Sequence, residues 1–395
     1  MAGVYHIGFN LGTSWLRFSE MPIHNVFISS KAFTSRQEAL CKYLNNSASD
    51  SRLFLGGNCY LSLIINAFSL RAKSVFESHS SFRFLIGNNL PFVPFLFRIL
   101  FPLSSICSDL GYPIIDIPSI AIWRKLIYML SDLLLVLVST RVLVESKSQV
   151  TRLTSYFYLA PYVIRKIYPF FVLPQAHLSF NISRQPSPIN PPVLPRSYLL
   201  FRGRLNLESG ILILLNAFLK SSSSPSHAKP SLFILGYGKF SQECHLSSFK
   251  YPHIIKFCHH HVSSEFLYNA TSSSLITVGQ LNANVPRLKY TLPHKFFESM
   301  VLSKIYLTPL YPPFIDFVRN NAVECIYLDS SGLENDRISF ATALDLFFLC
   351  DLIRNLKDEF QHVYRQNILY PFVLLYPTRS FYEYCTQINR HSLAF

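Results

Sequence analysis

The sequence is poor in charged residues for its length. Only 15% of its 395 residues are charged and 50% are hydrophobic, whereas a typical soluble domain carries about 25% charged residues. This composition excludes global disorder. Because a single hydrophobic core stops growing at roughly 250 to 300 residues, we expect two domains, each large enough to bury its own core.

Clustered metal ligands are also scarce. The eight cysteines are spread singly, and no Cys-x-x-Cys pair is present to hold zinc or a redox disulfide. Three consecutive histidines occur at 259–261, but successive side chains of a strand point to opposite faces, so the three cannot all face one ion. We therefore expect no metal site and no cofactor, and the isolated cysteines suit a reducing compartment.

Long hydrophobic runs are missing as well. No stretch reaches about 18 uninterrupted apolar residues, and the N-terminus lacks the basic start and apolar core of a secretory signal. Two segments come nearest, 92–103, broken by Arg98, and 126–138, broken by Asp132. We interpret both as buried or membrane-surface helices. The expectation is a cytoplasmic protein, with attachment to the inner face of a membrane as an option.

Basic residues outnumber acidic ones. The 36 Lys and Arg against 22 Asp and Glu give a formal net charge of +14, which suits an anionic partner. The basic residues are scattered among Phe, Leu and Pro, without a dense basic run or a nucleic-acid-binding signature. We therefore predict no nucleic-acid partner and favour peripheral contact with an anionic membrane.

The first half of the chain has the pattern of an α/β domain. Strand-length apolar runs alternate with segments of helical period at 36–44 and 123–137, which predicts a parallel sheet with crossover helices. The expected strands are 25–29, 53–55, 74–76, 112–117 and 141–145. A proline-dense stretch at 185–196 cannot continue a helix or a central strand. We expect an N-terminal domain at 1–184, a linker at 185–196, a second Rossmann-like domain at 197–340 and C-terminal helices at 341–395.

Two expected strands of the second half end in glycine. One ends at Phe201-Arg202-Gly203-Arg204 and the other at Leu235-Gly236-Tyr237-Gly238-Lys239. In a doubly wound domain, ligands bind at the carboxyl ends of the strands, where glycines let backbone N–H groups approach a phosphate. Taken singly, each run is also typical of ordinary turn chemistry.

The order of the motifs resembles the C-terminal domain of GT-B glycosyltransferases of the family 4 type. Gly203-Arg204-Leu205 is followed by Glu208-Ser209-Gly210 and a helix, and later by the Gly236-Tyr237-Gly238 turn. The segment 293–300, Pro-His-Lys-Phe-Phe-Glu-Ser-Met, is similar to the family's Pro-Asn-Lys-hydrophobic-Phe-Glu-x-Met motif. The resemblance implies an α/β chain with two Rossmann-like domains facing a cleft, which transfers a sugar from a nucleotide-sugar donor. The first domain would lie on the acceptor side, the second would bind the nucleotide sugar, and the C-terminal helices would pack back on the first domain.

The resemblance also implies roles for particular residues. Arg204 and Lys295 would stabilise the charge that develops on the leaving diphosphate. Glu298 would accept hydrogen bonds from the ribose hydroxyls, and Gly203, Gly236 and Gly238 would line the donor site. His79 lies just past an expected strand, where relatives often place a histidine facing the sugar or the acceptor. The catalytic candidates are thus His79, Arg204 and Lys295, and Ser146 is interpreted as structural.

Each of these residues also has an ordinary structural interpretation. Arg204 could be a surface cation near a strand end, and His79 could cap a strand. Lys295 and Glu298, three residues apart, could form a simple helix ion pair.

The sequence departs from the family pattern at several positions. Ser209 stands where the family has a phosphate-binding Lys, and Tyr290 stands where many relatives have a sugar-contacting Glu. The glycine-rich loop after the first strand is not evident. No Asp-x-Asp occurs, so the metal-diphosphate clamp of the other large glycosyltransferase fold is missing. The resemblance implies a metal-independent and retaining transferase.

Three functions remain open at this stage. The first is a transferase that acts on a saccharide or lipid-linked acceptor in cell-surface polysaccharide synthesis. The second is a non-catalytic GT-B-like protein that binds a nucleotide or a partner, which the changes at Ser209 and Tyr290 favour. The third, suggested by the 35 phenylalanines and the mean hydropathy of +0.25, is a membrane-embedded protein, and it requires spans that the sequence lacks.

Overall fold

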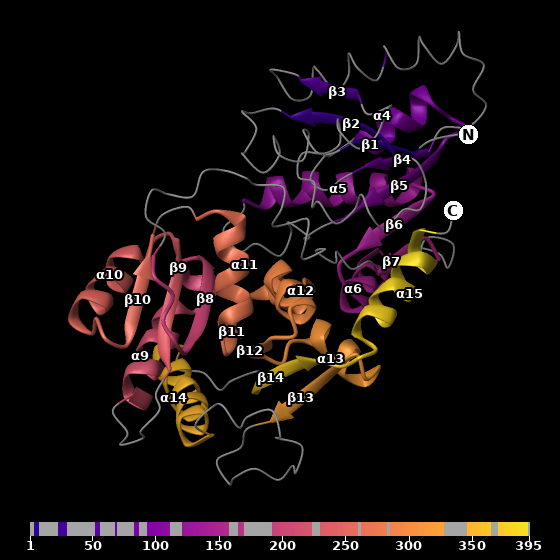
Figure 1. Cartoon of the computed structure of the whole chain (residues 1–395). Helices are drawn as coiled ribbons and strands as arrows, with labels where there is room; N and C mark the ends of the chain where they lie inside the picture. The colour runs from indigo at the N-terminus through magenta and orange to yellow at the C-terminus, as the bar shows by residue number, and fades with distance from the viewer. Residues whose placement is uncertain are drawn as a thin grey trace. The chain divides into compact units, whose positions relative to one another are not determined.

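The computed structural model describes residues 4–7, 23–29, 52–55, 68, 83–86, 93–110, 121–157, 165–169, 192–222, 230–259, 262–282, 285–327, 346–364 and 370–393. The chain divides into two compact units. The first comprises Met1–Ser183, Lys289–Leu292 and Glu383–Phe395, and the second comprises Arg184–Leu288 and Pro293–Tyr382. Each unit carries its own seven-stranded sheet, as Figure 1 shows.

The sheet of the first unit is parallel throughout. Its strands are β1 (Val4–Ile7), β2 (Ile23–Ser29), β3 (Arg52–Leu55), β4 (Arg83–Ile86), β5 (Ser105–Asp109), β6 (Arg141–Val144) and β7 (Ile167–Pro169). They lie in the order β3-β2-β1-β4-β5-β6-β7, which is the order of a doubly wound Rossmann sheet with one added strand. The helices described in the main segment are α4 (Val93–Leu100), α5 (Ile122–Val138) and α6 (Lys147–Phe157).

Helix α6 begins at a cap that ties it to its neighbours. The backbone N–H of Gln149 donates to Ser146 Oγ at 3.2 Å, and Gln149 Oε1 accepts from the N–H of Glu145 at 3.0 Å. This reciprocal pattern resembles a capping box, which satisfies donors that the first helical turn leaves without partners. Gln149 also donates to the carbonyl oxygen of Leu110 at 3.0 Å. Ser146 thus has the structural position that the sequence predicts.

The strands and helices of the first unit match the prediction only in part. The expected strands at 25–29, 53–55 and 141–145 and the helix at 123–137 are present as β2, β3, β6 and α5. The expected elements at 36–44, 74–76 and 112–117 lie outside the described residues. Strands β1, β4, β5 and β7 were not predicted, because short segments such as Arg83–Ile86 and Ser105–Asp109 mix polar and apolar residues without the long apolar run of a buried strand.

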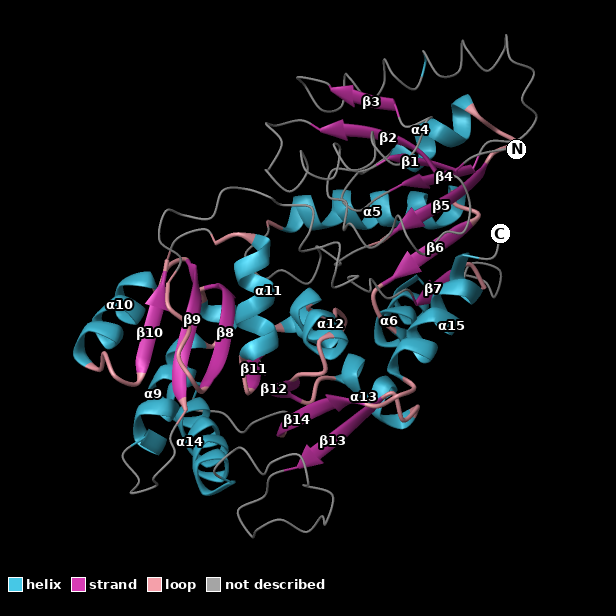
Figure 2. Ribbon diagram, viewed as in Figure 1, coloured by secondary structure: helices cyan, strands magenta, loops and turns pink. Residues whose placement is uncertain are grey.

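The sheet of the second unit is parallel except at one edge (Figure 2). Its strands are β8 (Tyr198–Arg204), β9 (Ser231–Tyr237), β10 (Ile255–Cys258), β11 (Ile276–Val278), β12 (Ile305–Pro309), β13 (Val323–Tyr327) and β14 (Phe372–Pro377), in the order β10-β9-β8-β11-β12-β14-β13. Strand β14 runs antiparallel to both β12 and β13. The helices are α9 (Ile211–Ser222), α10 (Ser241–Lys250), α11 (Ser264–Ser273), α12 (His294–Val301), α13 (Pro312–Arg319) and α14 (Leu346–Tyr364).

Aromatic residues fill much of the core of the second unit. Phe296 of α12 lies 5.6 Å from Tyr306 of β12 and 4.9 Å from Phe314 of α13, measured between ring centroids in edge-on arrangements. All three rings are fully buried, and edge-on aromatic pairs add to the stabilisation from burial. This packing fixes α12 on β12 and so determines where the side chains on its outer face lie.

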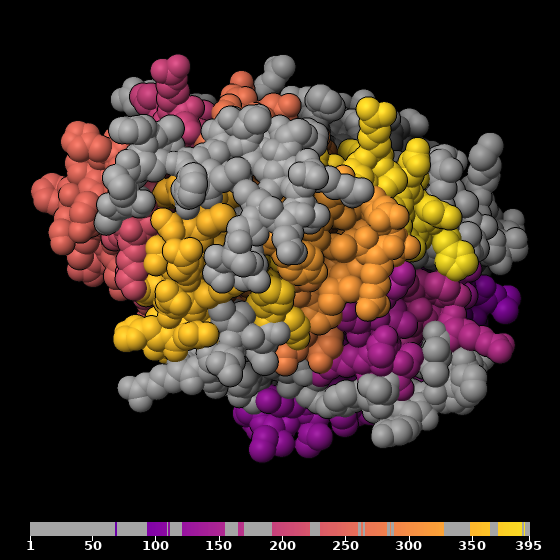
Figure 3. Space-filling view, turned by 90° about the horizontal axis from the view of Figure 1, so that it is seen from below, coloured from indigo at the N-terminus to yellow at the C-terminus, as the bar shows by residue number. Residues whose placement is uncertain are grey.

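The C-terminal segment is divided between the two units. Helix α14 packs on α9, where the rings of Phe218 and Phe348 meet at 5.8 Å and Asn216 Nδ2 donates to Glu359 Oε2 at 3.0 Å. Part of α14 reaches the molecular surface, where it appears golden yellow in Figure 3. Strand β14, which the sequence did not predict, joins the second sheet. Residues Glu383–Phe395, which include all but the first two residues of α15 (Phe381–Leu393), are grouped with the first unit.

Membrane-spanning helices were searched for among the residues that the structure describes. None of those helices combines the length and the apolar character needed to cross a bilayer.

Candidate functional site

The strand order of the second unit defines a switch point beside β8. From β8 the chain passes to β9 on one side, and it later returns to β11 on the other side. In open α/β sheets, ligands bind at such a point, beyond the carboxyl ends of the strands. Residues Arg202-Gly203-Arg204 end β8, and Gly279 follows β11 at the same edge.

The glycines at this edge are required by the backbone. Gly203 has φ +126° and Gly238 has φ +152°, conformations that residues with a side chain rarely adopt. A Cβ on Gly236 would lie 1.9 Å from the carbonyl oxygen of Gly203, its partner across β8 and β9. The glycine turns predicted from the sequence therefore bring two strand ends together at the switch point.

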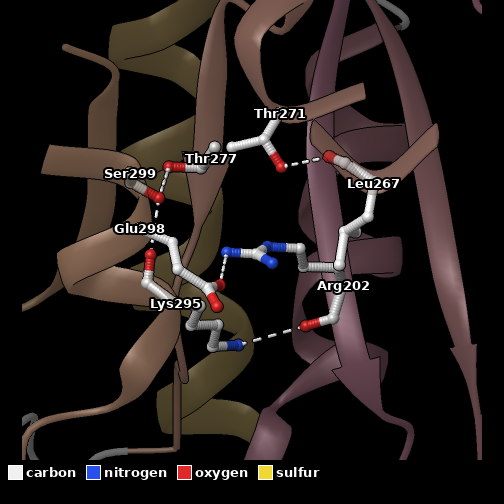
Figure 4. Close-up of polar contacts among 7 residues, drawn as sticks. All are labelled: Arg202, Leu267, Thr271, Thr277, Lys295, Glu298 and Ser299. Carbon is white, nitrogen blue, oxygen red and sulfur yellow. Dashed lines mark hydrogen bonds and ion pairs between the residues drawn. The ribbon is translucent and has the colours of Figure 1, made fainter. Parts of the chain in front are cut away.

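Helix α12 turns two charged side chains toward the end of β8. Lys295 Nζ donates to the carbonyl oxygen of Arg202 at 3.5 Å and lies 4.9 Å from the centroid of the Phe201 ring. One turn further, Glu298 forms an ion pair with the Arg202 guanidinium (Figure 4). The side chains of Arg202 and Glu298 are only 9% and 11% exposed, so the pair is largely screened from solvent.

Two hydroxyl groups link α12 to the sheet. Ser299 Oγ donates to the carbonyl oxygen of Lys295 at 2.6 Å, and Thr277 Oγ1 of β11 donates to Ser299 Oγ at 2.8 Å. Figure 4 shows this chain of contacts beside Glu298, from Thr277 through Ser299 to the backbone of Lys295. The helix that carries Lys295 and Glu298 is thus fixed to β11 by a buried link in addition to its aromatic packing.

Several buried polar atoms beside the ion pair lack partners. Among the described residues these atoms are Arg202 Nε, Gln280 Oε1, Tyr306 Oη and Thr308 Oγ1. A Cβ on Gly279 would lie 2.8 Å from Tyr306 Oη and 3.0 Å from Thr308 Cβ, so these groups converge beneath the end of β11. Burial raises the pKa of the Tyr306 phenol far above its ordinary value, and the charge of Arg202 opposes this shift. Buried polar groups without partners are rare outside functional sites.

The predicted cation Arg204 lies at the end of β8 and is exposed. It shares this edge with Lys295 and Glu298. Gly236 is the next-to-last residue of β9, and Gly238 follows the strand. The predicted donor-site residues of the second half therefore lie at or beside the carboxyl ends of β8 and β9. His79 lies outside the described residues.

Ser209, which replaces the family's phosphate-binding Lys, has a local role. Its Oγ donates to the carbonyl oxygen of Asn206 at 2.6 Å, and its N–H donates to Asn206 Oδ1 at 3.0 Å. Ser209 is buried within the short 3-10 turn η2 (Leu207–Ser209) that leads into α9. The following Gly210 has φ +67°, and its Cβ would lie 2.8 Å from Leu281 Cβ. The side chain of Ser209 therefore forms its hydrogen bond within the turn, to the N-cap residue Asn206.

Tyr290, which replaces a sugar-contacting Glu of many relatives, belongs to the first unit. Its carbonyl oxygen accepts a hydrogen bond from Ser146 Oγ, and its ring lies 4.6 Å below the guanidinium of Arg152. Both partners belong to α6 or its cap. The residue at this position therefore packs within the first unit.

Solved structures with this arrangement cover nearly the whole chain. HepE of Anabaena, solved with UDP and glucose, is 10% identical, covers 99% of this chain and 98% of its own, and has a TM-score of 0.53. A glycosyltransferase of Rickettsia africae is 12% identical over 100% and 99% of the two chains, with a TM-score of 0.52. The UDP-forming α,α-trehalose-phosphate synthase of Burkholderia vietnamiensis is 10% identical over 92% and 98%, with a TM-score of 0.52.

The chain has the GT-B fold. At identities of 10 to 12%, this likeness concerns the fold alone. No protein-family model matches the sequence, and a search of the curated proteins finds no match.

Arg202 is the residue of the candidate site that sequence reasoning missed. It follows the apolar run Tyr198–Phe201 within β8 and is 8% exposed. A charged residue is almost never buried unless it is paired, so its position in an apolar strand was the available signal. Of the three consecutive histidines, His259 is exposed and the other two lie outside the described residues. The described residues contain no group of metal-ligating side chains that could hold an ion.

Proposed function

We propose that this GT-B chain is a glycosyltransferase of the family 4 type that takes its sugar from a nucleotide-sugar donor. The observation that carries the proposal is the meeting of α12 with the end of β8. There, Lys295 and Glu298 face the switch point of the sheet, beside the glycine turns and the exposed Arg204. A cation, a carboxylate and close backbone approach are what a nucleoside diphosphate requires.

The chemistry assigned to each residue follows from the donor. Breaking the bond between sugar and diphosphate develops negative charge on the leaving group, and fixed cations lower the barrier by stabilising that charge. Lys295 and Arg204 take this role. Glu298 accepts hydrogen bonds from the ribose hydroxyls, and its ion pair with Arg202 keeps the carboxylate in one orientation. In this proposal the reaction is retaining and independent of metal ions, and His79 faces the sugar or the acceptor.

The acceptor in this proposal is a saccharide or a lipid-linked saccharide, used in cell-surface polysaccharide synthesis. Among the structural neighbours, HepE is solved with UDP and glucose, and the Burkholderia vietnamiensis protein is a UDP-forming synthase. The formal charge of +14 supports contact with an anionic membrane, where a lipid-linked acceptor would lie.

A non-catalytic nucleotide-binding protein is the second candidate function. Two observations favour it. The side chain of Ser209 donates to the carbonyl oxygen of Asn206 and supplies no cation, and Tyr290, which replaces a sugar-contacting Glu of many relatives, packs within the first unit. A protein with these changes could keep the nucleotide and lose the transfer step.

The test is a calorimetric binding screen of the full chain against UDP, GDP, ADP, CMP and their sugars. We expect saturable binding of one nucleotide, weakened at least about tenfold in Arg204→Ala and Glu298→Ala, because a hydrogen bond to a charged group contributes about 1.5 to 3 kcal/mol. Lys256→Ala is the matched control, since Lys256 is an exposed cation of β10 in the same sheet.

Binding of no nucleotide by the folded protein would overturn both candidate functions. Release of nucleotide from the bound nucleotide-sugar in the presence of saccharide acceptors would favour the transferase. Tight binding with no turnover across a broad acceptor set would favour the non-catalytic protein.

A further inference from the structure

Helices α4 and α5 of the first unit expose an unusual number of large apolar side chains. We call this set the α4–α5 surface. It comprises Phe95, Ile99, Leu103, Ile122, Trp123, Leu126, Ile127, Leu130 and Leu137, which are 41 to 87% exposed. Leu103 lies in the segment after α4, the other eight residues lie on the two helices, and the helices contact each other (Figure 1). Exposed apolar sets of this kind mark interaction sites.

The exposed residues of α5 lie on one side of the helix. At about 100° of rotation per residue, the six positions from Ile122 to Leu137 fall within an arc of about 140°. The opposite side contains the buried Val136, which packs in the core of the first unit. Helix α5 is therefore an amphipathic helix in which the solvent side is apolar.

The α4–α5 surface is held in a fixed shape by Arg98. Its guanidinium donates to the carbonyl oxygen of Val138, at the C-terminal end of α5, through Nε at 3.0 Å and Nη2 at 2.8 Å. The same group donates to the carbonyl oxygens of Pro102 and Ser104 at 2.9 and 2.8 Å. The Arg98 side chain of α4 thus caps α5, and its charge is used inside the unit.

Basic side chains lie at both ends of α5. Arg124 is exposed at the N-terminal end of α5 with its guanidinium 5.0 Å from the Trp123 ring, next to Lys125. Lys166 Nζ lies 3.5 Å from the carbonyl oxygen of Leu137 at the other end. The one acidic residue of α5, Asp132, is largely buried, and burial raises its pKa to about 7.

We infer that the α4–α5 surface docks on an anionic lipid membrane, with α5 lying in the plane of the interface. Apolar side chains including a Trp, flanked by Lys and Arg on a helix whose one acid is largely buried, are the features of interfacial helices. The inference rests on the membrane contact proposed above and names the surface that makes it.

The experiment is sedimentation of the full chain with vesicles of phosphatidylcholine, with and without phosphatidylserine. We expect binding that requires phosphatidylserine and weakens with salt. The variant Ile122→Gln/Leu126→Gln/Leu130→Gln should lose at least about tenfold in affinity, because these side chains would no longer enter the apolar layer. The control Leu246→Gln/Phe249→Gln/Val363→Gln changes three exposed apolar residues of the second unit and should bind as the parent does.

Two further variants separate the contributions. Arg124→Gln/Lys125→Gln should reduce the dependence on phosphatidylserine, and Trp123→Phe should remove a blue shift of tryptophan fluorescence on vesicle binding. Equal binding by the parent and the Ile122→Gln/Leu126→Gln/Leu130→Gln variant would overturn the assignment of the surface while membrane contact stands. A parent that binds no vesicles, or that forms a dimer which the same variant dissociates, would also overturn it. Neither result would affect nucleotide binding by the second unit.

Discussion

The ion pair between Arg202 and Glu298 links the end of β8 to the middle of α12. Both side chains are about nine-tenths buried, so each charge needs the other to offset its loss of water. The pair therefore has two effects. It fixes α12 over the sheet edge, and it orients the carboxylate on which the proposed recognition of ribose depends.

Arg202→Leu should destabilise the second unit by about 3 kcal/mol, because it leaves the carboxylate of Glu298 buried without its partner. The free energy of unfolding in urea, followed by circular dichroism, would measure the loss. Arg204→Leu is the matched control, since Arg204 is exposed two residues further along, and a change within about 0.5 kcal/mol is expected there.

The double variant Arg202→Leu/Glu298→Leu should recover much of that stability, because it removes both buried charges. If the double variant is less stable than Arg202→Leu by the full effect of a second independent change, the two side chains do not form the pair described here.

The two glycines paired across β8 and β9 should respond differently to alanine. Gly203→Ala meets no atom within 4 Å and costs only the strain of φ +126°, whereas a Cβ on Gly236 would overlap the carbonyl oxygen of Gly203. We expect a loss of about 1 to 3 kcal/mol for Gly203→Ala and a larger loss for Gly236→Ala. Thermal unfolding of both variants would check the order, and equal losses would contradict the close approach of the two strands.

Helix α5 contains Asp132, whose pKa makes the stability of the protein depend on pH. Burial raises the pKa of Asp132 from 3.8 to about 7, and the charge of Arg152 opposes this shift. The folded protein therefore keeps a proton that the unfolded chain has lost at intermediate pH. The stabilisation from Asp132 is fully present below pH 3.8 and is lost as the pH rises through about 7.

Asp132→Asn should remove this pH dependence and make the first unit more stable than the parent at pH 8, by on the order of 2 kcal/mol. Both tryptophans, Trp15 and Trp123, belong to the first unit, so urea unfolding followed by tryptophan fluorescence reports on it. Arg152→Met should make the first unit less stable than the parent at pH 8, because it removes the charge that favours ionised Asp132. Parallel stability curves for the parent and Asp132→Asn between pH 5 and 8 would contradict this description of α5.

The strands and helices of the second unit were more predictable than those of the first. Segments such as Tyr198–Phe201 and Leu232–Leu235 are continuous apolar runs of buried parallel strands and end in glycine, so both their type and their end can be inferred. Strand β14 (Phe372–Pro377) was not predicted. It follows α14 and joins the sheet antiparallel to β12, so it does not fit the alternation of parallel strands and helices on which the prediction depends.

The candidate site was predicted in part, for a physical reason. Spacing along the sequence places Lys295 and Glu298 on one side of a helix, and in the structure both contact Arg202 of β8. The partner of Glu298 lies 96 residues away, and no local pattern specifies a pairing over that distance. The position of Ser209 inside a turn likewise depends on Asn206 as its acceptor, and the sequence alone did not indicate it.

On the scale of the whole chain, two Rossmann-like units divide the proposed tasks. The described residues of the second unit contain the switch point, the glycine turns and the charged pair on α12. The first unit carries the α4–α5 surface and the buried Asp132. We therefore propose that the second unit binds the donor nucleotide and that the first unit contacts the membrane.

Amide hydrogen exchange of the full chain, with and without the nucleotide selected in the binding screen, tests this account most directly. We expect slower exchange at the end of β8, in the turn after β9 and over the first turns of α12, because these backbone groups line the proposed site. The Glu298→Ala variant should lose that protection at the same nucleotide concentration. Protection confined to the first unit, or none at saturating nucleotide, would contradict the assignment of the donor site.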